Sequence, residues 1–194
     1  LHMACRQLAL WHARPATQHL TLAVNVSAKE FFDDGFVDYV SHTLNETGAP
    51  PEKLELELTE SQLMQDVDAA IKKMQALKQK GIRLALDDFG TGYSSLGYLR
   101  KLRFSTIKVD RSFVQSAATG NVESLAIIRA VVAMADSLEM STTAEGAETE
   151  KEVELIRQLG CRKIQGYFFG RPMPAKDAED LFRNPHYLAK QSAA

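Results

Sequence analysis

The feature that most constrains the fold is a strict alternation between short apolar segments and segments with helical spacing of apolar residues. A strand followed by a helix, repeated along the chain, predicts a parallel sheet with crossover helices. No internal repeat, long linker or low-complexity tract interrupts the pattern, so residues 1–194 are expected to form a single domain. The predicted strands are Leu20–Val24, Leu54–Leu58, Ile82–Leu86, Thr106–Val109, Ser141–Ala144 and Lys163–Phe168.

Caps and apolar stripes predict the helices between these strands. Ser27 and Glu30 form a capping box that opens a helix with inward residues from Phe31 to Leu44, ended by Gly48. The remaining helical stripes are Leu1–Leu8, Met64–Met74, Leu96–Leu102, Leu125–Val132, Val153–Leu159 and Ala175–Phe182.

The spacing of the predicted strands distinguishes two parallel folds. Their centres lie about 29 residues apart, close to the roughly 31 residues per unit of an eight-unit barrel. A doubly wound open sheet gathers polar residues at one or two strand ends, whereas a barrel gathers them from many. Here every predicted strand ends in a polar residue, which favours an α/β fold of the TIM-like (β/α)8 type with about six units present. The residues at the carboxyl ends are Asn25, Glu57, Asp87, Asp88, Lys108, Asp110, Glu145 and Gln165.

The side chains at these strand ends indicate a metal site. Asn25, Glu57, Asp87 and Asp88 offer only oxygen ligands, which Mg²⁺, Mn²⁺ and Ca²⁺ prefer. The five histidines have no paired spacing, so zinc is not expected. Adjacent aspartates can bridge two cations for in-line attack on phosphorus. Lys108 would then hold the attacking water or stabilise transition-state charge; an ion pair with Asp110 or Glu145 is the structural alternative, and the two roles are compatible.

The loop at residues 88–95 contains the DFG triplet of protein kinases, but no other kinase motif accompanies it. It also lacks the spacing of a phosphate-binding glycine loop. We interpret it as a loop beside the aspartate pair that orders around a ligand. Glu60 is either a helix-start carboxylate near Ser61 or a hydrogen-bond anchor for a neighbouring loop.

Composition excludes several classes of protein. The net charge of −2 and 45% hydrophobic residues exclude disorder and a strongly basic nucleic-acid binder. No apolar run approaches the roughly 18 residues of a membrane-spanning helix. Cys5 and Cys161 cannot form a disulfide framework, which suggests a reducing, cytoplasmic location.

Six ordered motifs carry a resemblance to a known family. LAVNVS, LELELTES, LALDDFGTGYSSL, IKVDRSFV, AEGAET and IQGYFFGRPMP resemble the EAL domain, the bacterial cyclic di-GMP phosphodiesterase, up to about Pro174. The resemblance implies a modified (β/α)8 barrel with one antiparallel strand. It also implies hydrolysis of cyclic di-GMP to linear pGpG with two Mg²⁺ or Mn²⁺ ions.

The resemblance also assigns roles to individual residues. Asn25, Glu57 and Asp87 correspond to metal ligands, and Asp88 to the ligand of the second cation. Lys108 corresponds to the lysine at the catalytic water and Glu145 to its acid/base partner. Glu60 corresponds to the glutamate that steadies the DDFGTGYSS loop, which is implicated in dimerisation. The positions expected to bind substrate are Asp110, Glu148, Gln165 and Tyr93.

Contacts with the bases are less defined by the motifs. Tyr93, Tyr167 or Phe168 could stack on a guanine, and each is equally compatible with packing inside the barrel. Ala147 replaces a common Val, which is a small packing change.

The Glu-Ala-Leu motif that names the family is absent from this sequence. We therefore expect an N-terminally truncated domain that lacks roughly 60–70 residues, about two barrel units. The resemblance further implies a homodimer attached to sensory or GGDEF-type domains.

Three functions are compatible with these observations. The first is an active phosphodiesterase, because every catalytic position that can be checked is intact. The second is a cyclic di-GMP receptor without turnover. The third, a barrel enzyme that uses Lys108 as a Schiff-base amine, explains neither the acidic strand ends nor the glycine-rich loop.

Overall fold

The computed structural model describes residues 1–90, 99 and 101–183. The chain divides into two compact units. The first contains residues 1–86 and the described residues between 95 and 104, and the second contains residues 87–90 and those from 105 onward. Strand β3 (Arg83–Phe89) begins in the first unit and ends in the second.

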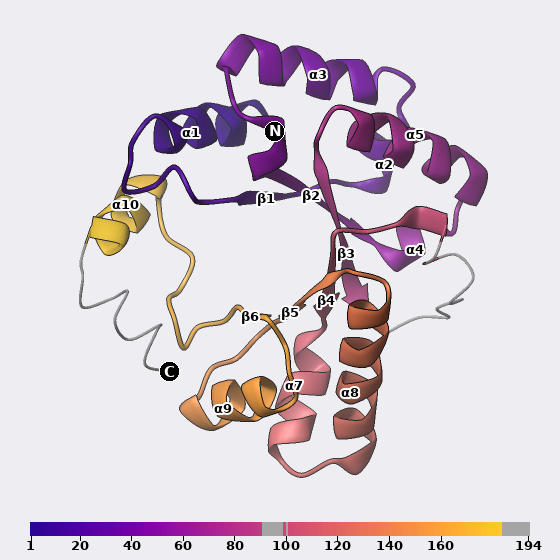
Figure 1. The fold of residues 1–194 in the computed structure, drawn as a ribbon, viewed down its shortest axis with the longest axis vertical. Coiled ribbons are helices and arrows are strands. Elements are labelled where there is room, and N and C mark those ends of the chain that lie inside the picture. The colour runs from indigo at the N-terminus through magenta and orange to yellow at the C-terminus, as the bar shows by residue number, and fades with distance from the viewer. Residues whose placement is uncertain (91–98, 100, 184–194) are drawn as a thin grey trace. The chain divides into compact units, whose positions relative to one another are not determined.

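The first unit contains two paired strands and the helices that cover them (Figure 1). Strands β1 and β2 run parallel, with Asn25 opposite Glu57 at their carboxyl ends. Helix α1 packs on α3, and α3 packs on α5. The elements are α1 (His2–His12), β1 (Leu22–Asn25), α2 (Ala28–Phe32), α3 (Phe36–Thr47), η1 (Pro51–Lys53), β2 (Leu54–Thr59), α4 (Glu60–Leu63) and α5 (Val67–Gln79).

Strand β2 is buried on both faces, and its two faces differ in chemistry. Leu54, Leu56 and Leu58 point to one face and are fully buried among apolar side chains. Glu55 and Glu57 point to the other face and are also buried. Burying a carboxylate costs free energy unless it is paired. The face of β2 that carries Glu55 and Glu57 is therefore a candidate for a functional site.

The single helix predicted after Ser27 is wrong; the chain forms α2 and α3 instead. The capping box of Ser27 and Glu30 is present. The break follows from Asp33, whose carboxylate accepts a hydrogen bond from the Gly35 amide at 2.8 Å. Such a local turn competes with the helical hydrogen bond and ends the helix.

The inward face predicted for the next helix is also partly wrong. Met64 lies outside the helix and is 37% exposed. Asp66 caps α5 by accepting the Ala69 amide at 3.0 Å. Met74 is buried as predicted, whereas Val67 and Ile71 are half-buried and the other buried residues are Ala70 and Leu77.

The second unit continues the alternation of strands and helices (Figure 1). Strands β4, β5 and β6 are parallel neighbours, with Lys108 opposite Thr143 and Thr143 opposite Lys163. Helix α8 packs against β4 and β5. The elements are β4 (Thr106–Val109), α7 (Arg111–Ala118), α8 (Val122–Ser137), β5 (Ser141–Ala144), α9 (Glu150–Gln158), β6 (Lys163–Ile164) and α10 (Ala175–Arg183). The eight-residue helix α7 was not predicted.

Strand β6 is shorter than the predicted Lys163–Phe168. The reason is the close approach of Gly166 to Ala147, where any Cβ at position 166 would overlap the Ala147 backbone. The Ala147 amide donates to the Gln165 carbonyl at 3.2 Å, and the chain then turns. The backbone therefore leaves the strand ladder after Ile164.

Part of the predicted helix at Leu96–Leu102 lies outside the described residues. Leu99 and Leu102 are helical and buried. Among the described residues, each helix is too short or too polar to span a membrane.

Candidate active site

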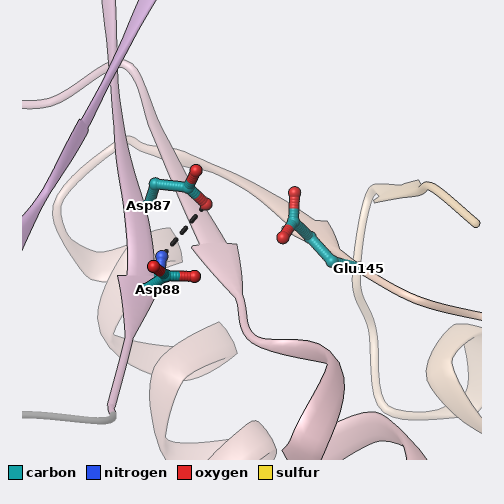
Figure 2. A group of neighbouring side chains, drawn as sticks. All are labelled: Asp87, Asp88 and Glu145. Carbon is teal, nitrogen blue, oxygen red and sulfur yellow. Dashed lines mark hydrogen bonds between the residues drawn. The ribbon is translucent and has the colours of Figure 1, made fainter. Parts of the chain in front are cut away.

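Three carboxylates of the second unit converge at the ends of β3 and β5. Asp87 and Asp88 lie on β3, and Glu145 follows β5 directly (Figure 2). One carboxylate oxygen of each lies within 4.8 Å of the others. Neighbouring residues of a regular strand point to opposite faces. The left-handed backbone of Asp88 (φ +54°) allows both aspartates to enter one cluster, and its amide donates to Asp87 Oδ1 at 3.0 Å.

Lys108 supplies the positive charge of this carboxylate cluster. Its side chain is buried, and its Nζ lies 3.1 Å from Asp87 Oδ1 and 2.6 Å from Glu145 Oε1. Of the ion pairs considered from the sequence, the one with Glu145 is present. Asp110 instead caps α7, accepting the Ser112 amide at 2.9 Å. The lysine is therefore fixed between two acids at the carboxyl end of β4.

The electrostatics of the cluster favour an added cation. Burial raises the pKa of the Asp88 carboxyl above its ordinary value, and the charges of Asp87 and Asp110 raise it further. Lys108 acts in the opposite direction but does not cancel these effects. The part of this rise that comes from Asp87 and Asp110 reflects negative charge gathered around Asp88. A divalent ion would relieve that crowding.

Beside the cluster lies an open pocket of about 290 Å³. It gathers three residues predicted to bind substrate, Asp110, Glu148 and Gln165, together with two of the cluster carboxylates. Its lining is Asp88, Asp110, Arg111, Glu145, Gly146, Glu148, Gln165, Gly166 and Tyr167. Tyr93, the fourth predicted substrate contact, lies outside the described residues, as does most of its loop.

Backbone hydrogen bonds hold the three loops that form this pocket. The Glu145 amide donates to the Val109 carbonyl at 3.0 Å, and the Gln165 amide donates to the Ala144 carbonyl at 2.8 Å. The Glu148 amide donates to the Glu152 side-chain carboxylate (Oε2) at 2.7 Å, as part of the capping that starts α9. The pocket residues thus sit on loops anchored to strand ends and helix starts.

The aromatic residues after β6 are partly exposed. Tyr167 lines the pocket and is 49% exposed, and the Arg171 guanidinium lies 4.5 Å from its ring centroid. Phe168 does not line this pocket and packs edge-on against Phe169. Of the two aromatic candidates that the structure describes, Tyr167 is the one placed to meet a ligand here.

The first unit carries the other predicted site residues. Asn25 is exposed, whereas Glu57 opposite it is buried, as is Glu60 at the start of α4. The Thr59 amide donates to the Gln62 side chain at 3.1 Å and fixes this helix start. The pairing of β1 with β2 therefore brings Asn25 and Glu57 side by side, as their positions at the strand ends predicted.

Two features were missed in the sequence reading. Arg83 Nε lies 3.3 Å from Glu55 Oε2, a partly buried ion pair on the polar face of β2. The alternation LELELT marks Glu55 as sharing a face with Glu57 and could have revealed it. Arg111 lines the pocket, but only the placement of α7 shows this.

The donor set of the cluster fits a hard divalent cation. Asp87, Asp88 and Glu145 offer carboxylate oxygens close enough to share an ion, and among the described residues no sulfur or imidazole ligand joins the group. Mg²⁺ and Mn²⁺ favour this chemistry.

Comparison with known proteins decides the family. The family model described as the EAL domain matches residues 1–172. This chain belongs to the EAL domain family. It is 42% identical over 180 residues to the bifunctional diguanylate cyclase/cyclic di-GMP phosphodiesterase MucR of Pseudomonas aeruginosa, covering 91% of this chain and 25% of MucR. The chain spans about a quarter of the length of the curated relatives that it matches.

Solved EAL structures confirm the predicted TIM-barrel-like fold class. The phosphodiesterase of MucR in complex with c-di-GMP has a TM-score of 0.86 at 41% identity, covering 91% of this chain and 71% of that chain. The EAL domain of Mycobacterium smegmatis DcpA has a TM-score of 0.87 at 35% identity, covering 94% and 81%. Klebsiella pneumoniae BlrP1 in a manganese and cyclic di-GMP complex has a TM-score of 0.79 at 30% identity, covering 88% and 42%.

Proposed function

We propose that this EAL domain is a metal-dependent phosphodiesterase that hydrolyses cyclic di-GMP to linear pGpG. The observation that carries the proposal is the carboxylate cluster with Lys108 held inside it. The similarity to MucR, whose name includes this activity and whose phosphodiesterase binds c-di-GMP, supports the substrate.

Two Mg²⁺ or Mn²⁺ ions are the proposed cofactors. Asp87 and Asp88 would hold them in the second unit, and Asn25 and Glu57 are the proposed ligands from the first. Bound there, the ions would polarise the phosphodiester and lower the pKa of water. The manganese complex of BlrP1 supports this choice, and the oxygen-only donor set agrees with it.

In the proposed reaction, Lys108 donates hydrogen bonds to the attacking water from its fixed place between Asp87 and Glu145. Glu145 accepts a proton from the water as the new oxygen–phosphorus bond forms. The bond from phosphorus to the 3′ oxygen breaks, and the leaving 3′ oxygen keeps the electron pair and takes this proton back from Glu145. The same lysine stabilises negative charge on the phosphoryl oxygens. Because Lys108 is buried, its charge is little screened by solvent.

The remaining predicted residues take supporting roles in this proposal. Asp110, Glu148 and Gln165 line the pocket in which a guanine would lie. Glu60 would steady the loop that contains Tyr93, and Tyr93 itself would contact the substrate.

A hydrolysis assay tests the proposal. The protein should convert cyclic di-GMP to pGpG with Mg²⁺ or Mn²⁺ and lose this activity in EDTA, followed by chromatography of the nucleotides. Asp87→Asn should abolish turnover, whereas Asp38→Asn, at an exposed position in the first turn of α3, should not. Tight binding of cyclic di-GMP without pGpG formation in the wild-type protein would show that the domain is a receptor and not an enzyme.

We also propose a cytoplasmic homodimer that works with sensory or GGDEF-type domains. The free thiols of Cys5 and Cys161 support a reducing compartment. The bifunctional name of MucR supports a link to cyclase domains.

A further inference from the structure

Among the described residues that line the pocket beside the carboxylate cluster, one is cationic: Arg111, in the first turn of α7. The other charged lining residues are acidic: Asp88, Asp110, Glu145 and Glu148. Arg111 is exposed, and its side chain forms no ion pair or hydrogen bond with the residues that the structure describes. A guanidinium among four carboxylates, yet not paired with them, is available to a ligand.

A close approach of two loops holds Arg111 at this place. Gly146 has φ +71°, and a Cβ there would overlap the Arg111 side chain and lie 3.3 Å from the Arg111 Cα. The loop after β5 therefore packs directly on the first turn of α7. Only glycine at position 146 permits this contact.

The charges that line the pocket favour the base of a nucleotide over its phosphate. Asp110 and Glu148 would repel a phosphate. The phosphate is instead expected at the carboxylate cluster, where the proposed metal ions would offset the negative charge. A guanine offers N–H donors at N1 and N2 for the carboxylates and acceptors at O6 and N7 for a donor. The guanidinium fork matches O6 and N7 together.

We propose that Arg111 is a specificity residue that binds the O6/N7 edge of one guanine of the substrate. This rests on the proposed function, since cyclic di-GMP is the substrate that brings a guanine here. Adenine has an amino group in place of O6, so Arg111 disfavours it.

Replacement of Arg111 tests this assignment in the protein supplied with Mn²⁺. Arg111→Met should lower kcat/KM for cyclic di-GMP by about 5- to 150-fold, the discrimination of one bidentate contact to guanine. Hydrolysis of bis(p-nitrophenyl) phosphate, a phosphodiester without a base, should stay at the wild-type rate. Arg129→Met, at an exposed position on α8, is the matched control.

The two substrates separate the outcomes. Equal losses on both, or no loss on cyclic di-GMP, would overturn the assignment to guanine. If the wild-type protein hydrolyses neither substrate, the proposed function has failed. The affinity of the wild-type and Arg111→Met proteins for cyclic di-GMP and cyclic di-AMP, measured by calorimetry, then decides the role of Arg111: an unchanged preference for guanine would refute it.

The loop contact provides a second, independent variant. Gly146→Ala should displace Arg111 and reproduce the selective loss on cyclic di-GMP. Gly48→Ala is the control, since its φ of +69° is nearly the same and an added Cβ there meets nothing within 4 Å. An equal effect of both alanine variants would assign the loss to backbone strain and contradict the positioning of Arg111.

Discussion

The two units of the chain treat buried charge differently. In the first, Glu55 on β2 forms an ion pair with Arg83, at 3.3 Å. In the second, Lys108 contacts two carboxylates, and Asp88 adds a third acid beside them. The Glu55–Arg83 pair sets one positive charge against one negative charge. The carboxylate cluster sets one lysine against three acids and therefore carries excess negative charge. The comparison distinguishes a structural ion pair from a site prepared for a cation.

The largest expected effect comes from removing the central cation. Lys108→Met should lower kcat for cyclic di-GMP by about 10²- to 10³-fold, the range typical of removing one donor that stabilises transition-state charge. Binding of substrate should fall much less, because the residues of the pocket remain. Steady-state kinetics together with calorimetric binding measure both quantities.

Lys151→Met, at an exposed position on α9, is the control for Lys108. A Lys108 variant with a raised KM and an unchanged kcat would show that this lysine only binds substrate.

An intermediate effect is expected for the ion pair of the first unit. Arg83→Met leaves Glu55 buried without its cation and should lower the free energy of unfolding by about 1–3 kcal/mol, less than a fully buried pair because Arg83 is partly exposed. Urea denaturation measures this change.

The double variant Glu55→Leu/Arg83→Met should recover most of that loss, because no charge is then buried alone. If the double variant is as unstable as the single one, packing rather than charge explains the effect.

The smallest effect is expected at Asp88, and it has the opposite sign. The raised pKa means that the folded state binds this proton more tightly than the unfolded state, so stability falls as pH rises above about 3.8 and through the raised value. Asp88→Asn should therefore raise Tm of the metal-free protein at pH 7 by about a few degrees at most. Asparagine also tolerates the left-handed backbone at this position.

Thermal scans without metal check the prediction for Asp88. The advantage of the variant should shrink towards pH 3.8 and reverse when Mn²⁺ is added, because the wild type gains more from the ion. A lower Tm for Asp88→Asn in EDTA would show that the cluster does not crowd negative charge.

Much of the fold could be predicted because strand position and strand-end chemistry are local properties. Asp87 and Glu145 were expected together since parallel strands end at one edge, and they are close. The break at Asp33 was missed because a side-chain turn there overrides a continuous apolar stripe. The early end of β6 was missed because it depends on Gly166 meeting Ala147, which is distant in sequence.

The pocket shows the same limit. Asp110, Glu148 and Gln165 were placed in it from motifs that resemble the EAL family, whereas Arg111 was not, since α7 itself was not predicted. The Glu55–Arg83 pair was within reach, because side-chain alternation along β2 places Glu55 on the polar face.

The contact between Gly166 and Ala147 has a consequence for engineering the substrate preference of this domain. It joins main chain to main chain, with no side chain that selection could trim or enlarge. A library of variants selected for other cyclic dinucleotides should keep glycine at position 166, because every other residue there forces the loops apart. Substitutions should be introduced at positions 111, 148 and 165, because these side chains line the pocket and can change while the backbone of the loops stays in place.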